Sequence, residues 1–143
     1  MNILRSPRYP DEITDRGLLS CTYSFMVYSG MSDEIARSEA LELNRPPILL
    51  TGLAGTVDNL LQQINIDGVS VEALKVSEDD PAIRVLRLVE QYGNAVTGEV
   101  KFNRPCSIAE SDLQENPLTP WSGLQQQIDL EFKPFEIKTL MLK

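Results

Sequence analysis

The alternation of apolar and polar positions is most informative between Val71 and Phe102. Two segments rich in β-forming residues, 71–76 and 82–92, are separated by residues 77–81, which gather Ser, Asp and Pro. Gly93 and Asn94 both tolerate positive φ, and they precede a third alternating segment, 95–102. The pattern predicts a meander of three antiparallel strands. A five-residue loop would close its first hairpin and a tight turn its second.

The two later segments of this meander differ in their faces. In residues 95–102, Val96, Val100 and Phe102 fall on one side and charged or hydroxyl side chains on the other, as expected for one buried and one wet face. Residues 82–90 carry apolar side chains on both sides: Leu86 and Leu88 share one face, and Ile83, Val85 and Val89 share the other with Arg87 among them. That strand is therefore expected to be covered on both faces.

Further strands are expected on both sides of the meander. Residues 18–28 show the most regular alternation, and Asp67-Gly68 is a strong hairpin signal. The period becomes helical over residues 31–44. The remaining strand signals lie at residues 60–66, 107–113, 127–132 and the C-terminus. The pattern predicts a mainly β chain: one antiparallel β-sandwich domain over residues 1–143, with about seven to nine strands and one short helix.

Composition restricts the possible partners. Thirteen Lys and Arg against twenty-one Asp and Glu give a net charge of −8, and no basic cluster offsets it. Such a chain is repelled by phosphate, so neither nucleic acid nor an anionic membrane is an expected partner. No signal-peptide pattern or membrane-spanning apolar run is present. Cys21 and Cys106 form no CxxC motif, which indicates reduced, mostly buried thiols in a cytoplasmic protein.

The chain contains no histidine, which removes most catalytic constellations. Nucleophile activation by histidine and the usual zinc shells are both excluded, so no cofactor or metal is expected in this chain. Chemistry by paired carboxylates remains conceivable. The acidic residues Glu110, Asp112 and Glu115 are, however, interpreted as the wet side of a strand or loop. A carboxylate-dependent glycosidase is therefore the least favoured function.

Several segments resemble, in order, the C-terminal β domains of family 38 glycoside hydrolases, the retaining α-mannosidases. They are LRSPRYPD at 4–11, DRG at 15–17, ALKVSEDD at 73–80, RLVE at 87–90 and KPFEIKTLML at 133–142. The resemblance implies a C-terminal part of a larger enzyme that hydrolyses terminal α-mannosidic bonds. The zinc ion and the aspartate nucleophile of that enzyme would lie in an N-terminal catalytic domain. This chain would be a non-catalytic accessory or structural domain with that catalytic domain as its partner, and mannosides as a further possible partner.

Four charged residues interrupt strongly apolar segments: Lys75, Arg87, Glu90 and Glu136. Burying such groups without partners costs several kcal/mol, roughly, so they are expected to be paired, with Arg87 on a carboxylate. The alternative is that some of them, together with Arg5, contact the catalytic domain. Neighbouring Phe135 and Ile137 are expected in the core.

A free-standing carbohydrate-binding module is the second hypothesis. Trp121 follows Pro120 in a predicted loop, where an exposed indole could stack on a sugar. The alternative for this residue is that it packs against the domain's own core.

Overall fold

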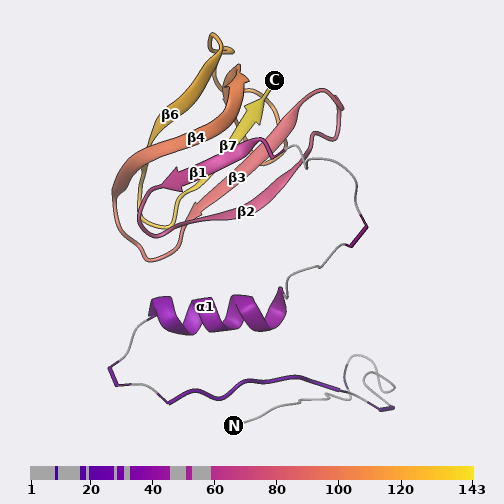
Figure 1. Cartoon of the computed structure of the whole chain (residues 1–143), viewed down its shortest axis with the longest axis vertical. Helices are drawn as coiled ribbons and strands as arrows, with labels where there is room; N and C mark the ends of the chain where they lie inside the picture. The colour runs from indigo at the N-terminus through magenta and orange to yellow at the C-terminus, as the bar shows by residue number, and fades with distance from the viewer. Residues whose placement is uncertain are drawn as a thin grey trace. The chain divides into compact units, whose positions relative to one another are not determined.

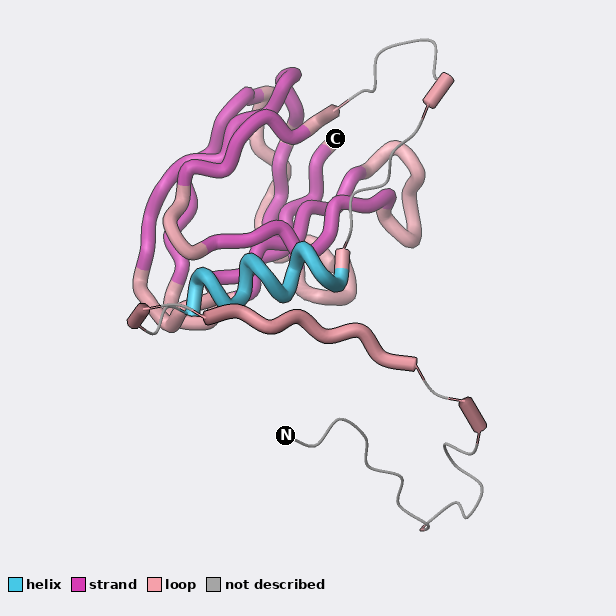
Figure 2. Tube along the Cα trace, turned by 60° about the horizontal axis from the view of Figure 1, so that its bottom comes forward, coloured by secondary structure: helices cyan, strands magenta, loops and turns pink. Residues whose placement is uncertain are grey.

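The structure is a computed structural model. It describes residues 9, 17–18, 20–27, 29–30, 33–45, 51–52 and 59–143. The chain divides into two compact units, Met1–Thr51 and Gly52–Lys143. The helix α1 (Asp33–Asn44) lies in the first unit, and every strand of the described residues lies in the second (Figures 1 and 2).

The seven strands form two antiparallel sheets, which confirms the predicted fold class. The three-stranded sheet has the order β1-β4-β6 and contains β1 (Leu61–Asn65), β4 (Val96–Cys106) and β6 (Gln125–Phe132). The four-stranded sheet has the order β2-β3-β7-β5 and contains β2 (Val69–Val76), β3 (Arg84–Glu90), β7 (Ile137–Leu142) and β5 (Ile108–Ser111). Figure 1 shows how β3 and β7 run beside each other although about fifty residues separate them.

One apolar core joins the two sheets. Leu86 and Leu88 of β3 are fully buried, and so are Val100 of β4 and Leu140 of β7. Phe102 of β4 belongs to the same cluster. Because these side chains come from both sheets, the sheets pack face to face as a sandwich. The buried face of residues 95–102 is therefore the one that the alternation predicts.

The predicted meander is only half right. β2 and β3 form the expected hairpin, with residues 77–83 as its loop. The turn at Gly93, where φ is +75°, instead carries the chain from β3 into the other sheet. The Asp67-Gly68 turn likewise joins β1 of one sheet to β2 of the other. The hairpins predicted at Asp67-Gly68 and at Gly93-Asn94 were therefore wrong. β3 pairs with β2 and β7, while β4 pairs with β1 and β6.

The first unit differs from its sequence pattern in one respect. The helix α1 is confirmed, with Asp33 and Glu34 in its first turn. Residues 20–27, in contrast, are not in a strand, and Tyr23 and Phe25 are exposed. Alternation alone does not make a strand when no neighbouring strand supplies backbone partners, and none pairs with this segment among the described residues. A single sandwich domain over residues 1–143 stays a prediction.

Both cysteines are free thiols, as expected. Cys106 is buried in the sandwich, and burial raises the pKa of its thiol. Cys21 is exposed, against the expectation of burial. Of the helices that the structure describes, none is long and apolar enough to cross a membrane.

Candidate functional site

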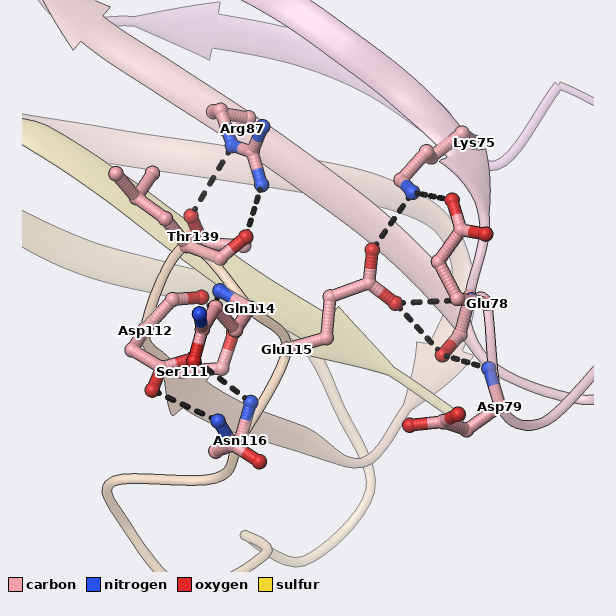
Figure 3. A network of polar contacts seen from close by, with 12 residues as sticks. Lys75, Glu78, Asp79, Arg87, Ser111, Asp112, Gln114, Glu115, Asn116 and Thr139 are labelled. Carbon is pink, nitrogen blue, oxygen red and sulfur yellow. Dashed lines mark hydrogen bonds and ion pairs between the residues drawn. The ribbon is translucent and has the colours of Figure 1, made fainter.

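The candidate site lies on the outer face of the four-stranded sheet, the face turned away from the core. Val85 and Arg87 alternate along β3 with the core leucines, and register places them beside Met141 and Thr139 of β7. Val85, Thr139 and Met141 are buried although they lie outside the core cluster. The turn that follows β5, residues 112–116, contacts the four-stranded sheet through Arg87 and Lys75 (Figure 3).

Glu115 connects this turn to the edge strand β2. Its carboxylate lies 2.7 Å from Lys75 Nζ, and it accepts hydrogen bonds from the Ser77 hydroxyl at 2.8 Å and the Glu78 backbone N–H at 3.0 Å (Figure 3). Lys75, followed by the Glu78 N–H, lowers the pKa of Glu115 from 4.5 to about 2. The same contact with Glu115, together with Glu78, raises the pKa of Lys75. The buried carboxylate stays ionised at neutral pH.

Asp112 organises the turn that presents Glu115. Its carboxylate accepts hydrogen bonds from the backbone N–H groups of Gln114 and Asn116, both at 2.9 Å, and from the Asn116 side chain at 3.0 Å. These contacts, with Asn116 first, lower the pKa of Asp112. Glu115 itself has a φ of +68°, which few non-glycine residues adopt. The interpretation of Glu115 as a wet residue was wrong, because the strained turn points its side chain onto the sheet.

Arg87 is the other contact between the sheet and this turn. Its guanidinium donates to the Thr139 hydroxyl at 3.4 Å and to the Leu113 carbonyl oxygen at 3.1 Å (Figure 3). The expected ion pair with a carboxylate is absent among the described residues, so this prediction was wrong. Neutral acceptors take its place because the turn brings a carbonyl group, and not its acidic side chains, over Arg87.

Glu90 is the last residue of β3 and is 1% exposed. Its carboxylate accepts the backbone N–H groups of Tyr92 at 2.9 Å, Gly93 at 2.8 Å and Phe135 at 2.8 Å. Burial raises the pKa of Glu90, but these N–H groups together outweigh burial, so the pKa is lowered. Glu90 thus has its expected partners, although they are N–H groups and not a cation. It joins the β3–β4 crossover to the turn between β6 and β7.

Glu136 has a different environment. It accepts the Lys133 backbone N–H at 2.7 Å and lies 3.5 Å from Lys138 Nζ, and these groups, with Lys133 first, lower its pKa. Lys138 also contacts Glu110 at 3.2 Å. Glu136 and Lys138 line a pocket of about 430 Å³, bounded by the start of β4, the end of β6 and the turn into β7.

Two apolar residues of this region are not where the pattern predicts them. Phe135 and Ile137 are 68% and 48% exposed, so their assignment to the core was wrong. Phe135 lies in the turn before β7 with a φ of +59°, so its side chain does not follow the alternation of a strand.

The predicted site residues do not converge on one place. Lys75 and Arg87 both contact the turn over the outer face, whereas Glu90 and Glu136 bind other elements. Trp121 is 38% exposed and precedes Ser122, whose backbone N–H and hydroxyl bind the backbone of Ile108. Arg5 lies outside the described residues.

The chemistry available to these groups is narrow. The carboxylates of Glu90, Asp112 and Glu115 all have lowered pKa values, so near neutral pH none of them is a proton donor. Over the described ranges, no group of three or more His, Cys, Asp or Glu side chains is placed to hold a metal ion. The arrangement of Glu90, Asp112 and Glu115 fixes loops to a sheet.

The two sheets over a shared core define the class of this protein, an antiparallel β-sandwich. Residues 68–140 match the family described as "Glycosyl hydrolases family 38 C-terminal beta sandwich domain", and the chain belongs to this family. The match begins just before β2 and ends within β7. It confirms the resemblance that the sequence motifs indicate.

One curated relative extends this likeness to almost the whole chain. The chain is 27% identical to alpha-mannosidase G of Dictyostelium discoideum over 155 aligned positions, which cover 97% of this chain and 14% of the relative. It thus spans about one seventh of that protein's length. No solved structure gives a significant match.

Proposed function

We propose that this chain acts as the non-catalytic C-terminal part of a larger α-mannosidase and supports its catalytic part. The match to the family's C-terminal sandwich carries the proposal. The relative adds weight, because a protein named for α-mannosidase activity contains a segment similar to nearly all of this chain within only 14% of its length. A catalytic domain of the same polypeptide would be the partner of this sandwich. Terminal α-mannosides would be the substrates of that catalytic domain.

The zinc ion of the catalytic reaction does not fit the residues of this chain. Histidine is absent, and the two cysteines lie in different units. The carboxylates of Glu90, Asp112 and Glu115 are already engaged by N–H groups and Lys75. We therefore assign zinc to the catalytic part and derive no step through it here. The free thiols fit a reducing compartment, and a cytoplasmic location is part of the proposal.

Lys75, Arg87, Glu90 and Glu136 act within the domain in this proposal. Each has a partner in its own unit, so their contribution to contact with the catalytic part is indirect, through the loops that they hold. The alternative of a free-standing module that binds sugar through Trp121 has no observation in its favour. Trp121 is only partly exposed, and hydrogen bonds to β5 fix the residue that follows it.

The proposal is tested on the polypeptide that carries this sequence in its own cells. An antibody raised against the domain should detect a band several times larger than 16.0 kDa, and its immunoprecipitate should hydrolyse a chromogenic α-mannoside. The recombinant 143-residue chain should show no hydrolysis in the same assay. A band near 16 kDa, or an inactive large precipitate, would contradict the proposal.

A further inference from the structure

Phe135 combines an unfavourable backbone conformation with an exposed side chain. Its φ of +59° lies in the left-handed region, which is unfavourable for a bulky residue. The Phe135 N–H donates to the buried carboxylate of Glu90 at 2.8 Å, which holds the turn in this conformation. Glycine or asparagine would adopt the same backbone at less cost and keep the same N–H. The turn alone therefore does not account for a phenylalanine.

Packing within the sandwich accounts for only part of the side chain. The ring lies over Gly93, where an added Cβ would come within 2.6 Å of it. The residue nevertheless remains 68% exposed, more than any other aromatic residue in 59–143. Two positions further on, Ile137 is 48% exposed. Within the second unit, a large apolar ring is therefore mostly exposed, while its edge packs on Gly93 and its backbone N–H is held by Glu90.

We propose that Phe135, with Ile137 beside it in sequence, is the anchor by which this sandwich docks on the remainder of its own polypeptide. This inference rests on the proposed function. A rigid, exposed aromatic residue is typical of interface hot spots, because little side-chain entropy is lost when it becomes buried. Glu90 preorganises the anchor, which gives this buried carboxylate a role beyond the stability of the corner. The receiving surface would be an apolar recess that accepts the free face of the ring.

The remainder of the polypeptide is favoured over other occupants by two observations. The family is defined as a C-terminal domain, and the relative is about seven times as long as the matched segment, so most of such a protein lies outside this chain. A second copy of the chain is disfavoured because each copy carries a net charge of −8.

The test compares point variants in the full polypeptide that carries this chain. Phe135→Asn keeps the left-handed backbone and the N–H to Glu90 but removes the ring, and Phe135→Gly repeats the test with a second residue suited to that backbone. Leu124→Asn is the matched control, because Leu124 is 75% exposed and lies at the other end of β6. Phe135→Tyr should restore the anchor. The readout is the rate at which dilute trypsin releases a fragment recognised by the domain antibody.

We expect Phe135→Asn and Phe135→Gly to accelerate release by about tenfold, as loss of one hot spot implies, with wild-type rates for Leu124→Asn and Phe135→Tyr. If trypsin released the fragment at equal rates from all variants of a large, active polypeptide, Phe135 would not be the anchor, and the proposed function would remain intact. A polypeptide of only 16 kDa would overturn both. Two other results would also overturn the proposal. If the Phe135 variants kept the wild-type release rate but lost self-association, the ring would contact a second copy of the chain. If they kept that rate but lost retention on a mannoside resin, the ring would contact a sugar.

Discussion

Individual charged residues in this sandwich connect loops to the sheets through hydrogen bonds and ion pairs. Glu90 and Glu115 are both buried, yet each accepts three hydrogen bonds or ion contacts, most of them from backbone N–H groups or Lys75. Such contacts stabilise the ionised form and offset the cost of removing a carboxylate from water. The charges that the sequence places inside apolar segments are thus structural in this unit.

Glu115 should make stability depend on acid pH. Its pKa is about 2 in the folded chain and 4.5 ordinarily, so its contribution is fully present above about pH 4.5 and is lost as pH falls toward 2. Glu115→Gln removes that contribution. We expect the variant to have a lower urea midpoint than the parent chain at pH 7 and the same midpoint near pH 2. Glu131→Gln, at an exposed position, is the control, and a midpoint gap that persists at pH 2 would contradict the assignment.

Replacement of Glu90 should be more disruptive than replacement of any exposed acidic residue. Glu90→Ala leaves the N–H groups of Tyr92, Gly93 and Phe135 without their acceptor, whereas Glu90→Gln retains one oxygen. The parent chain should have the highest urea midpoint, Glu90→Gln a lower one and Glu90→Ala the lowest. Amide hydrogen exchange should rise at residues 92–93 and 135 in both variants. Unchanged exchange there would show that another group holds this corner.

At the scale of elements, the pattern predicts strands better than it predicts their partners. Each described strand falls within or beside a segment predicted from alternation, because one buried face per strand is a local property. The turns at residues 67–68 and 93–94 are also predicted correctly in position. Their role as crossovers between sheets is not, since an Asp-Gly or Gly-Asn turn looks alike whether the next strand joins the same sheet or the opposite one.

The candidate site is predicted least well, for a related reason. Lys75, Arg87, Glu90 and Glu136 stand out because charge interrupts apolar runs, and that signal correctly indicates partnered groups. The partners themselves are distant in sequence: Glu115 lies 37 and 38 residues from the two groups of the β2–β3 loop that donate hydrogen bonds to it. Phe135 is wrongly assigned to the core because no local sequence pattern reports that it has a left-handed backbone in the turn before β7.

The close approach of Asn65 and Ile66, at the end of β1, to the neighbouring strand β4 depends on the absence of a side chain at Gly98. A Cβ at this position would lie 2.2 Å from the Asn65 carbonyl oxygen and 2.9 Å from Ile66 Cγ1. Backbone cannot move aside as a flexible side chain can, so Gly98→Ala should destabilise the chain by about 2 kcal/mol or more. Gly123→Ala is the matched control, because nothing lies within 4 Å of its added Cβ. Urea denaturation would measure both, and similar midpoints for the two variants would contradict this packing.

For the molecule as a whole, the core belongs to one of the two units. Every residue of the core cluster lies between Leu60 and Leu142, and so does every sheet partner of the described strands. The residues that match the family lie within the same unit. Among the described residues, the apolar core that stabilises the sandwich therefore lies within the second unit.

Deletion of residues 1–51 should consequently leave a folded sandwich. The fragment 52–143 is expected to unfold in one cooperative transition, with a free energy of unfolding within about 0.5 kcal/mol of that of the parent chain, the usual limit for changes away from the core. Far-ultraviolet circular dichroism should lose only the helical signal of α1. If the fragment unfolded without a cooperative transition, or bound a dye specific for exposed apolar surface, the first unit would have to supply part of the core. The single domain over residues 1–143 that the sequence predicts would then be the better description.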